Sequence, residues 1–308
     1  MRKPDFIVIG AMRAGTTALA AALNKHPDIA ISEPKEPNFF ATLHGALEYA
    51  GPGDQWFAGQ NSSDWESYLS LFDEGAPLVG EASAMYLALP ETAADVSRML
   101  PGVKIVVVLR DPAARARSAH SYLRSKGREP LASFLDGLEA EPTRKDEGFG
   151  PMWWYREASD YEAGLRAYFD EFGRDAVLVI TNEELKSDPE RTVSEVLAFL
   201  GARDDLAVAN FLTSQAVNSG GEPRSALLTR ALYPPDGIRA AVRRVAPGFL
   251  RRAVGKARAA STTGAPPPKA PLPESAAQHF RESALRTQAL IDRDLSTVWS
   301  SLRDVNNG

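Results

Sequence analysis

The sequence predicts a three-layer α/β fold, in which a mostly parallel central sheet is flanked by helices. Short apolar runs rich in Val and Ile alternate with stretches of helical periodicity, which is typical of α/β folds. The strongest run, VKIVVVLRDP at residues 103–112, has five apolar residues in succession, as strands buried on both faces of a parallel sheet do. In such sheets, ligands bind at the carboxyl ends of the strands.

The first elements are predicted from short, clear patterns. DFIVIG (5–10) indicates a strand that ends at a glycine, and TTALAAALNKHP (16–27) indicates a helix that stops before its proline. DIAIS (28–32) is a further candidate strand, and residues 33–64 have a loop-like composition. SDWESYLSLF (63–72) then indicates an amphipathic helix capped by serine or aspartate.

The alternation continues along the rest of the chain. The expected elements are strands in APLVGEAS (76–83), VKIVVVLRDP and DAVLVITNEEL (175–185), and helices in PETAADVSRMLP (90–101), AARARSAHSYLRS (113–125) and DPERTVSEVLAFLG (188–201). A proline-rich loop joins them to a last helix, which is expected to run from Ser275 to Trp299. Residues 275–301 are expected to pack on the core of a single domain spanning residues 1–308.

Composition excludes several kinds of site. The chain has no cysteine, which excludes disulfides, thiolate metal ligands and a cysteine nucleophile. Its four histidines lie far apart, and we expect no metal. The first apolar run is too short for a signal peptide, and no stretch approaches 18 apolar residues, so a cytoplasmic protein without a transmembrane segment is expected.

Charge is distributed unevenly along the chain. The net charge is −5, yet residues 221–270 hold ten basic and two acidic residues. This pattern favours contact with an anionic ligand or surface through Arg224–Arg258, although a solvated helical face is an alternative. We expect residues 221–274 to form a basic, helical and proline-rich, lid-like insertion.

The stretch IGAMRAGTTAL (9–19) predicts an anion site. A strand, a glycine turn and a helix start direct backbone N–H groups and the helix dipole at one point. Gly10 and Gly15 fit the pattern of a phosphate-binding P-loop, but Thr16 stands where that pattern has lysine, with Thr17 after it. The cation of this loop is Arg13 instead.

GAMRAGTTAL followed by LNKHPDI resembles the 5′-phosphosulfate loop of sulfotransferases that use 3′-phosphoadenosine 5′-phosphosulfate (PAPS), most closely the heparan-sulfate-type and bacterial enzymes. The resemblance implies a P-loop-like fold and PAPS as co-substrate, without a metal. It places the 5′ end of the nucleotide on Arg13, Ala14, Gly15, Thr16 and Thr17. Arg13 would stabilise charge at the oxygen that bridges phosphate and sulfate.

A second motif, VVVLRDPAARARSAHSYL (106–123), resembles the 3′-phosphate motif of the same family. The resemblance assigns that phosphate to Arg110 and Ser118, and a guanidinium suits a phosphate because it can bind two oxygens at once. The alternative is that Arg110 merely pairs with a carboxylate such as Asp111.

The resemblance also supplies a candidate base. In SEPKEPNFF (32–40), Glu36 stands where heparan-type enzymes have the carboxylate that takes the acceptor's proton. The alternative is an exposed glutamate beside Lys35. Glu81 in GEASAMYL is the reserve candidate, and His120 is a lesser one. Ala82 stands where heparan enzymes often carry lysine, which argues against a heparan-like acceptor.

The function expected from these motifs is PAPS-dependent O-sulfotransfer by in-line displacement onto a hydroxyl of a carbohydrate, glycolipid or secondary metabolite, and no nucleic acid is expected as a partner. Lys269 and Arg224 stand where heparan-type enzymes have a basic glycine loop over the nucleotide, and the resemblance implies that they contact it, although the K-G-R pattern of that loop is missing. Two other functions stay open: a P-loop small-molecule kinase, and a non-catalytic nucleotide-binding interaction module.

Overall fold

The computed structural model describes residues 1–43, 48–55, 61–73, 75–216 and 271–303. At its centre is a five-stranded sheet of order β2-β3-β1-β4-β5, and all pairings between these strands are parallel. The strands are β1 Phe6–Gly10, β2 Ile29–Ile31, β3 Leu78–Glu81, β4 Lys104–Leu109 and β5 Val177–Thr181. The predicted fold class is therefore confirmed.

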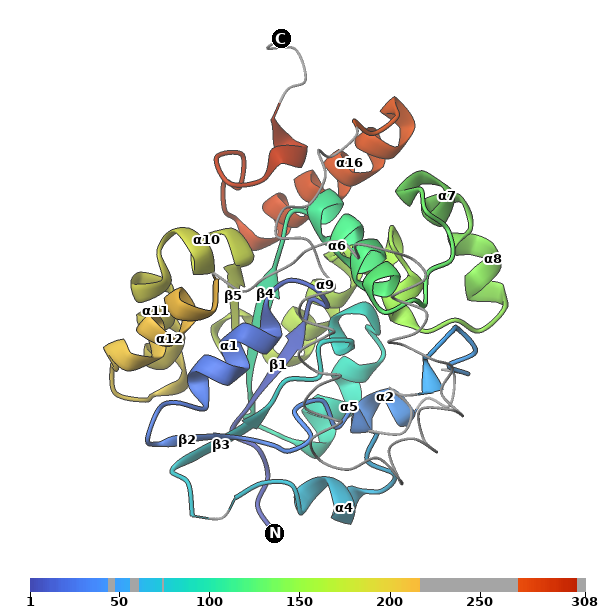
Figure 1. The fold of residues 1–308 in the computed structure, drawn as a ribbon. Coiled ribbons are helices and arrows are strands. Elements are labelled where there is room, and N and C mark those ends of the chain that lie inside the picture. Colours follow the sequence, from blue (N-terminus) through green and yellow to red (C-terminus); the bar gives the residue numbers. More distant parts are fainter. Residues whose placement is uncertain (44–47, 56–60, 74, 217–270, 304–308) are drawn as a thin grey trace, which may run out of the picture.

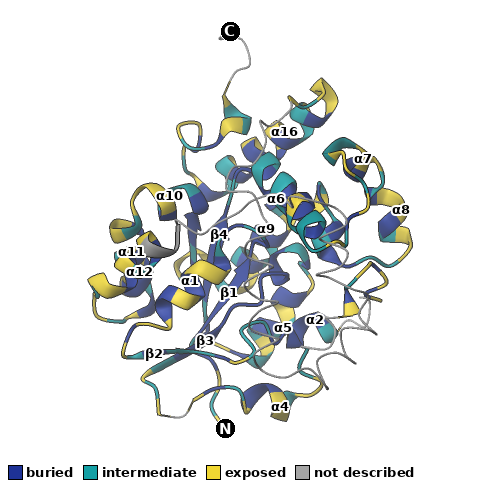
Figure 2. Ribbon diagram, viewed as in Figure 1, coloured by how far each residue is buried: buried dark blue, intermediate teal, exposed yellow. Residues whose placement is uncertain are grey.

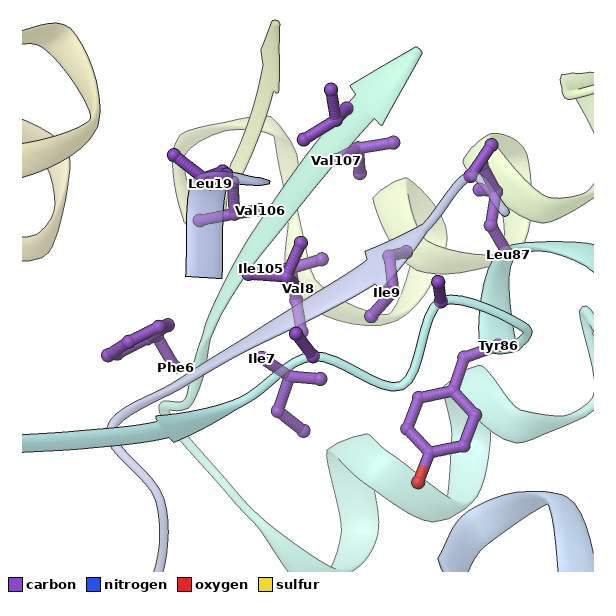
Figure 3. Packing of buried hydrophobic residues seen from close by; sticks show 14 of the residues in the cluster. Phe6, Ile7, Val8, Ile9, Leu19, Tyr86, Leu87, Ile105, Val106 and Val107 are labelled. Atoms are coloured by element: carbon purple, nitrogen blue, oxygen red, sulfur yellow. The ribbon is translucent and has the colours of Figure 1, made fainter. Parts of the chain in front are cut away.

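Burial explains why the strands are so apolar. All five residues of β1 and the last five of β4 are buried, and side chains of the two strands pack together in the core (Figure 3). Figure 1 shows helices on both sides of the sheet, and Figure 2 shows that exposed residues concentrate on their outer faces. The helices that contact the strands are α1 Thr16–Leu23, α9 Glu162–Phe172, α10 Asn182–Ser187 and α11 Pro189–Leu200. Helix α5 (Thr92–Met99) packs on α9, and α12 (Leu206–Ala216) packs on α1 and α11.

Helix α6 (Pro112–Ser125) leaves the end of β4 and joins the core to the carboxyl-terminal part of the chain. Its buried face meets Trp153, Tyr155 and Phe280 in a second apolar cluster, and it packs on α16 (Glu274–Ile291). The remaining helices are α2 Phe39–Thr42, α4 Trp65–Leu69, α7 Phe134–Glu139 and α8 Glu141–Asp146, with short 3-10 turns η1 Tyr86–Ala88, η2 Pro151–Trp153, η3 Glu157–Ser159, η4 Arg174–Ala176 and η5 Ser300–Leu302.

The structure corrects the extent of two predicted elements. The last helix ends at Ile291, not at Trp299, because Asp292 adopts a left-handed conformation (φ 52°) and Leu295 donates its N–H to the side chain of Gln288. The segment 33–64 is not wholly loop, since α2 lies within it.

Other features agree with the sequence or lie beyond the described part. Asp64 caps α4, as one of the two predicted caps, and Gly201 ends α11 with φ 82°. Of the insertion expected at 221–274, only residues 271–274 are described, so Arg224–Arg258 and Lys269 lie outside the described residues. No helix in the described part of the chain is both long and apolar enough to cross a membrane.

Candidate functional site

The glycine loop joins β1 to α1 at the carboxyl edge of the sheet, as predicted. Gly15 has φ 110°, a conformation that side chains disfavour, and a Cβ there would lie 2.7 Å from the amide nitrogen of Asn182. That amide donates to Ala14 O at 2.7 Å and so holds the turn. No side chain of the described residues caps α1. The first N–H groups of α1 are therefore free to bind an anion.

Arg13 lies at the middle of this loop in a left-handed conformation, with φ 69°. Its guanidinium carbon sits 4.3 Å from the centre of the Tyr122 ring on α6. Burial lowers the pKa of Arg13, Arg110 lowers it further, and the charge of Glu36 opposes that shift. Its Nε atom is buried without a hydrogen-bond partner among the described residues. The chain thus holds a desolvated cation with an unused donor.

Arg110 follows β4, the neighbour of β1 in the sheet, and this brings the two predicted anion motifs together. Its Nη1 donates to Arg13 O at 3.1 Å. Asp111 does not neutralise it, because the Asp111 carboxylate accepts from Ala114 N at 2.9 Å and from the Ser301 backbone at 2.7 Å. Among the described residues, Arg110 forms no ion pair. Its charge is available to an anionic ligand.

Ser118 lies half-buried on α6, one turn before Tyr122. Residues four apart lie on the same face of a helix, so Ser118 lies on the face whose Tyr122 contacts Arg13. Thr16 is buried at the start of α1, whereas Thr17 is exposed. The predicted nucleotide residues before position 200 therefore surround one edge of the sheet.

Glu36 lies in the loop between β2 and α2 and is partly exposed. Its Oε1 is 2.5 Å from Lys35 Nζ, and 27% of its side chain is exposed. Lys35 Nζ also donates to Ala82 O at 3.1 Å. The ammonium group thus lies beside position 82, where the chain lacks the lysine of heparan enzymes. The charge of Glu36 acts on the Arg13 guanidinium and opposes the lowering of its pKa by burial.

Glu81 and His120, the other candidate bases, are buried. Burial raises the pKa of Glu81 to about 7, and four donor groups surround its carboxylate. His120 packs edge-on against Phe134 and Tyr155, and its Nε2 lies 3.1 Å from Leu131 O. These contacts favour a packing role for His120.

Two residues of the site were not predicted from the sequence. Tyr122 supports Arg13, and Asn182, at the start of α10, holds Ala14. Each acts across a long sequence separation. Tyr122 lies within the motif at 106–123, but nothing in the sequence signals its contact with Arg13. Within the described residues, no three His, Cys, Asp or Glu side chains are grouped so that they could hold a metal ion.

Comparisons with known proteins identify the family of the chain. A model described as the sulfotransferase family matches residues 4–205. The crystal structure of a sulfotransferase from Alicyclobacillus acidocaldarius is similar to this chain with a TM-score of 0.73 and 30% identity, covering 98% of this chain and 100% of that one.

Curated relatives are similar over shorter shares of their length. The membrane-associated sulfotransferase kil1 of Dictyostelium discoideum is 38% identical over 119 residues, which is 39% of this chain and 23% of that protein. The human bifunctional heparan sulfate N-deacetylase/N-sulfotransferase 3 is 31% identical over 217 residues, 65% of this chain and 22% of that protein. The chain therefore spans less than a quarter of the length of either.

Proposed function

The chain belongs to the sulfotransferase family, and from that premise we propose that it transfers a sulfuryl group from PAPS to a hydroxyl acceptor, with Glu36 as the base. One observation carries the proposal: Arg13 and Arg110 lie at the carboxyl ends of neighbouring strands, beside an uncapped helix start and within electrostatic range of Glu36. The two arginines suit the anionic sulfuryl donor, and the carboxylate suits an acceptor hydroxyl that must lose its proton.

Each charged residue has a distinct task in the proposed reaction. Glu36 takes the proton of the acceptor hydroxyl while the acceptor oxygen forms its bond to sulfur. As that bond forms, the bond between sulfur and the bridging phosphate oxygen breaks, and its electron pair stays on that oxygen. Arg13 stabilises the resulting charge, and because arginine does not deprotonate in proteins it acts electrostatically and not as an acid.

The nucleotide is proposed to bind along the same edge. The N–H groups at the start of α1 and the buried, unpaired Nε of Arg13 suit the 5′ end. Arg110, which has no ion pair among the described residues, and Ser118 suit the 3′-phosphate. Lys269 is proposed as a further contact from outside the described residues.

The acceptor is proposed to be a hydroxyl of a carbohydrate, glycolipid or secondary metabolite. The family relatives named for heparan sulfate make a desulfated heparan oligosaccharide the first acceptor to test. The basic segment Arg224–Arg258 supports an acceptor, or a peripheral surface, that carries negative charge.

Calorimetric titration tests the donor site. We expect adenosine 3′,5′-bisphosphate to bind in preference to ATP in the absence of magnesium, and Arg110→Ala to weaken it at least tenfold, about 1.4 kcal/mol. Arg117→Ala is the matched control, since it removes the same charge from the helix that follows Arg110, where the Arg117 guanidinium lies over the Phe134 ring. Preferred binding of ATP, or equal effects of the two substitutions, would contradict the proposal.

A further inference from the structure

The carboxylate of Glu81 is completely buried at the end of β3, with an exposure of 0%. Tyr68 donates its hydroxyl to Oε1 at 3.0 Å, and Tyr86 donates to the same oxygen at 3.3 Å. The other oxygen accepts from the N–H and from the hydroxyl of Ser83. A carboxylate has about four lone-pair positions, and all four are occupied here.

Two of these donor groups, the hydroxyls of Ser83 and Tyr86, also bind the backbone at residues 38–40, where the loop that carries Glu36 runs into α2. The Ser83 hydroxyl accepts from Asn38 N at 3.0 Å, and the Tyr86 hydroxyl accepts from Phe40 N at 3.3 Å. On the other side of Glu36, Lys35 O accepts from Ala82 N at 3.0 Å. Glu36 is thus fixed between anchors on both sides, and all of them lie in the segment that follows β3.

The direction of the hydroxyl protons links these contacts. A hydroxyl has one proton, and a neighbouring carboxylate that only accepts fixes where that proton points. The protons of Ser83 and Tyr86 therefore face Glu81, and their lone pairs face Asn38 N and Phe40 N. Tyr68 differs from these two, because its hydroxyl donates to Glu81 but has no bond to the Glu36 loop among the described residues.

We propose that Glu81 is a positioning residue for Glu36, which it holds in place through the oriented hydroxyls of Ser83 and Tyr86. The proposal rests on the proposed function in so far as Glu36 is the base. It also gives Glu81 a task other than proton transfer, since its lone pairs are all engaged and no water or acceptor reaches a group with 0% exposure.

A pair of matched tyrosine substitutions tests the proposal. Tyr86→Phe and Tyr68→Phe each remove one hydroxyl that donates to Glu81 Oε1, so we expect both to lower the melting temperature, and Tyr86→Phe to lower it further because it removes a second hydrogen bond. Only Tyr86→Phe also frees the N–H of Phe40, and Ser83→Ala frees that of Asn38. We expect the rate of amide hydrogen exchange to rise tenfold or more at Phe40 in Tyr86→Phe and at Asn38 in Ser83→Ala. In Tyr68→Phe, both exchange rates should stay within twofold of wild type.

Turnover and nucleotide binding complete the test. With PAPS and a desulfated heparan oligosaccharide, we expect Tyr86→Phe and Ser83→Ala to lower kcat tenfold, with unchanged affinity for adenosine 3′,5′-bisphosphate, and Tyr68→Phe to keep both. Equal exchange effects in the two tyrosine variants, no exchange effect at all, or faster exchange without a loss of kcat would each overturn the proposal. A wild type that binds no adenosine 3′,5′-bisphosphate would contradict the proposed function, whereas inactivity with this oligosaccharide would exclude only that acceptor. In both cases the exchange rates would still decide whether Glu81 holds the loop.

Discussion

Arg13 combines a costly backbone conformation with a costly side-chain environment. Its φ of 69° lies in the left-handed region, which costs a residue other than glycine about 1–3 kcal/mol. Its guanidinium is desolvated, and its Nε has no partner among the described residues. Such costs persist where the surroundings enforce them, and here Arg110 holds the carbonyl while Tyr122 supports the side chain.

Replacing Tyr122 tests how much that support matters. A cation over an aromatic face gains about 0.5–2 kcal/mol, so we expect Tyr122→Leu to lower kcat roughly 3- to 30-fold, with little change in nucleotide affinity. Tyr122→Phe keeps the ring and should stay near wild type. Equal kcat values in the leucine and phenylalanine variants would show that the stack does not orient Arg13. Steady-state turnover of PAPS measures both.

Glu36 allows a similarly direct test. We expect Glu36→Gln to lower kcat about 10²- to 10⁴-fold, the usual contribution of a general base, because the amide cannot accept the acceptor's proton. Glu33→Gln is the control, since Glu33 is an exposed glutamate in the same loop. Adenosine 3′,5′-bisphosphate should bind both variants as it binds wild type. A Glu36→Gln enzyme that keeps its kcat would require another base.

At the scale of single elements, the sequence predicted what local patterns determine. The Val- and Ile-rich runs, the glycine turn and the stop at Gly201 all follow from short-range chemistry, and the structure has them. The end of α16 could not be predicted, because it depends on how Asp292 turns and on the contact of Gln288 with Leu295. The hydrogen bonds that join Asp111, after β4, to Ser300 and Ser301 in η5 could not be predicted either, because about 190 residues separate the partners.

That link makes Asp111 an element-scale test. Its carboxylate caps α6 through Ala114 N and also accepts from the hydroxyls of Ser300 and Ser301 and from Ser301 N. We expect Asp111→Ala to lower the free energy of unfolding by about 1–3 kcal/mol, from a lost cap of about 1 kcal/mol and the lost bonds to η5. Ser301→Ala removes a single hydroxyl and should cost about 0.5–1.5 kcal/mol. Urea unfolding compares them, and equal costs would contradict the dual role.

At the scale of the whole molecule, the strand order determines which residues meet. Because β1 lies between β3 and β4, the glycine loop, Arg110 and the segment after Glu81 reach the same edge. Parallel strands predict that shared edge, so Arg13 and Arg110 could be placed from the sequence. The bonds of Ser83 and Tyr86 to Asn38 and Phe40 could not, since they join parts of the chain about 45 residues apart and depend on side-chain packing between them.

The raised pKa of Glu81 gives the whole molecule a pH dependence with a definite sign. Burial raises that pKa from 4.5 to about 7, and the surrounding Tyr68, Tyr86 and Tyr168 stay neutral in this range because their pKa values are raised too. A raised carboxyl pKa means that folding favours the protonated form. Its stabilisation is complete below the unfolded pKa and is lost as the pH rises through about 7.

We therefore expect the free energy of unfolding of wild type, relative to Glu81→Gln, to be about 3 kcal/mol larger at pH 4.5 than at pH 8, since 2.5 pH units at 1.36 kcal/mol each are lost between them. Urea unfolding of both proteins measures the difference, and a constant offset would contradict a titrating Glu81. Protection of Asn38 N against exchange should change in the opposite direction. At low pH the protonated Glu81 donates a hydrogen bond of its own and competes with Asn38 N for the Ser83 oxygen. The protonated form is therefore the more stable one, but it holds the Glu36 loop less firmly.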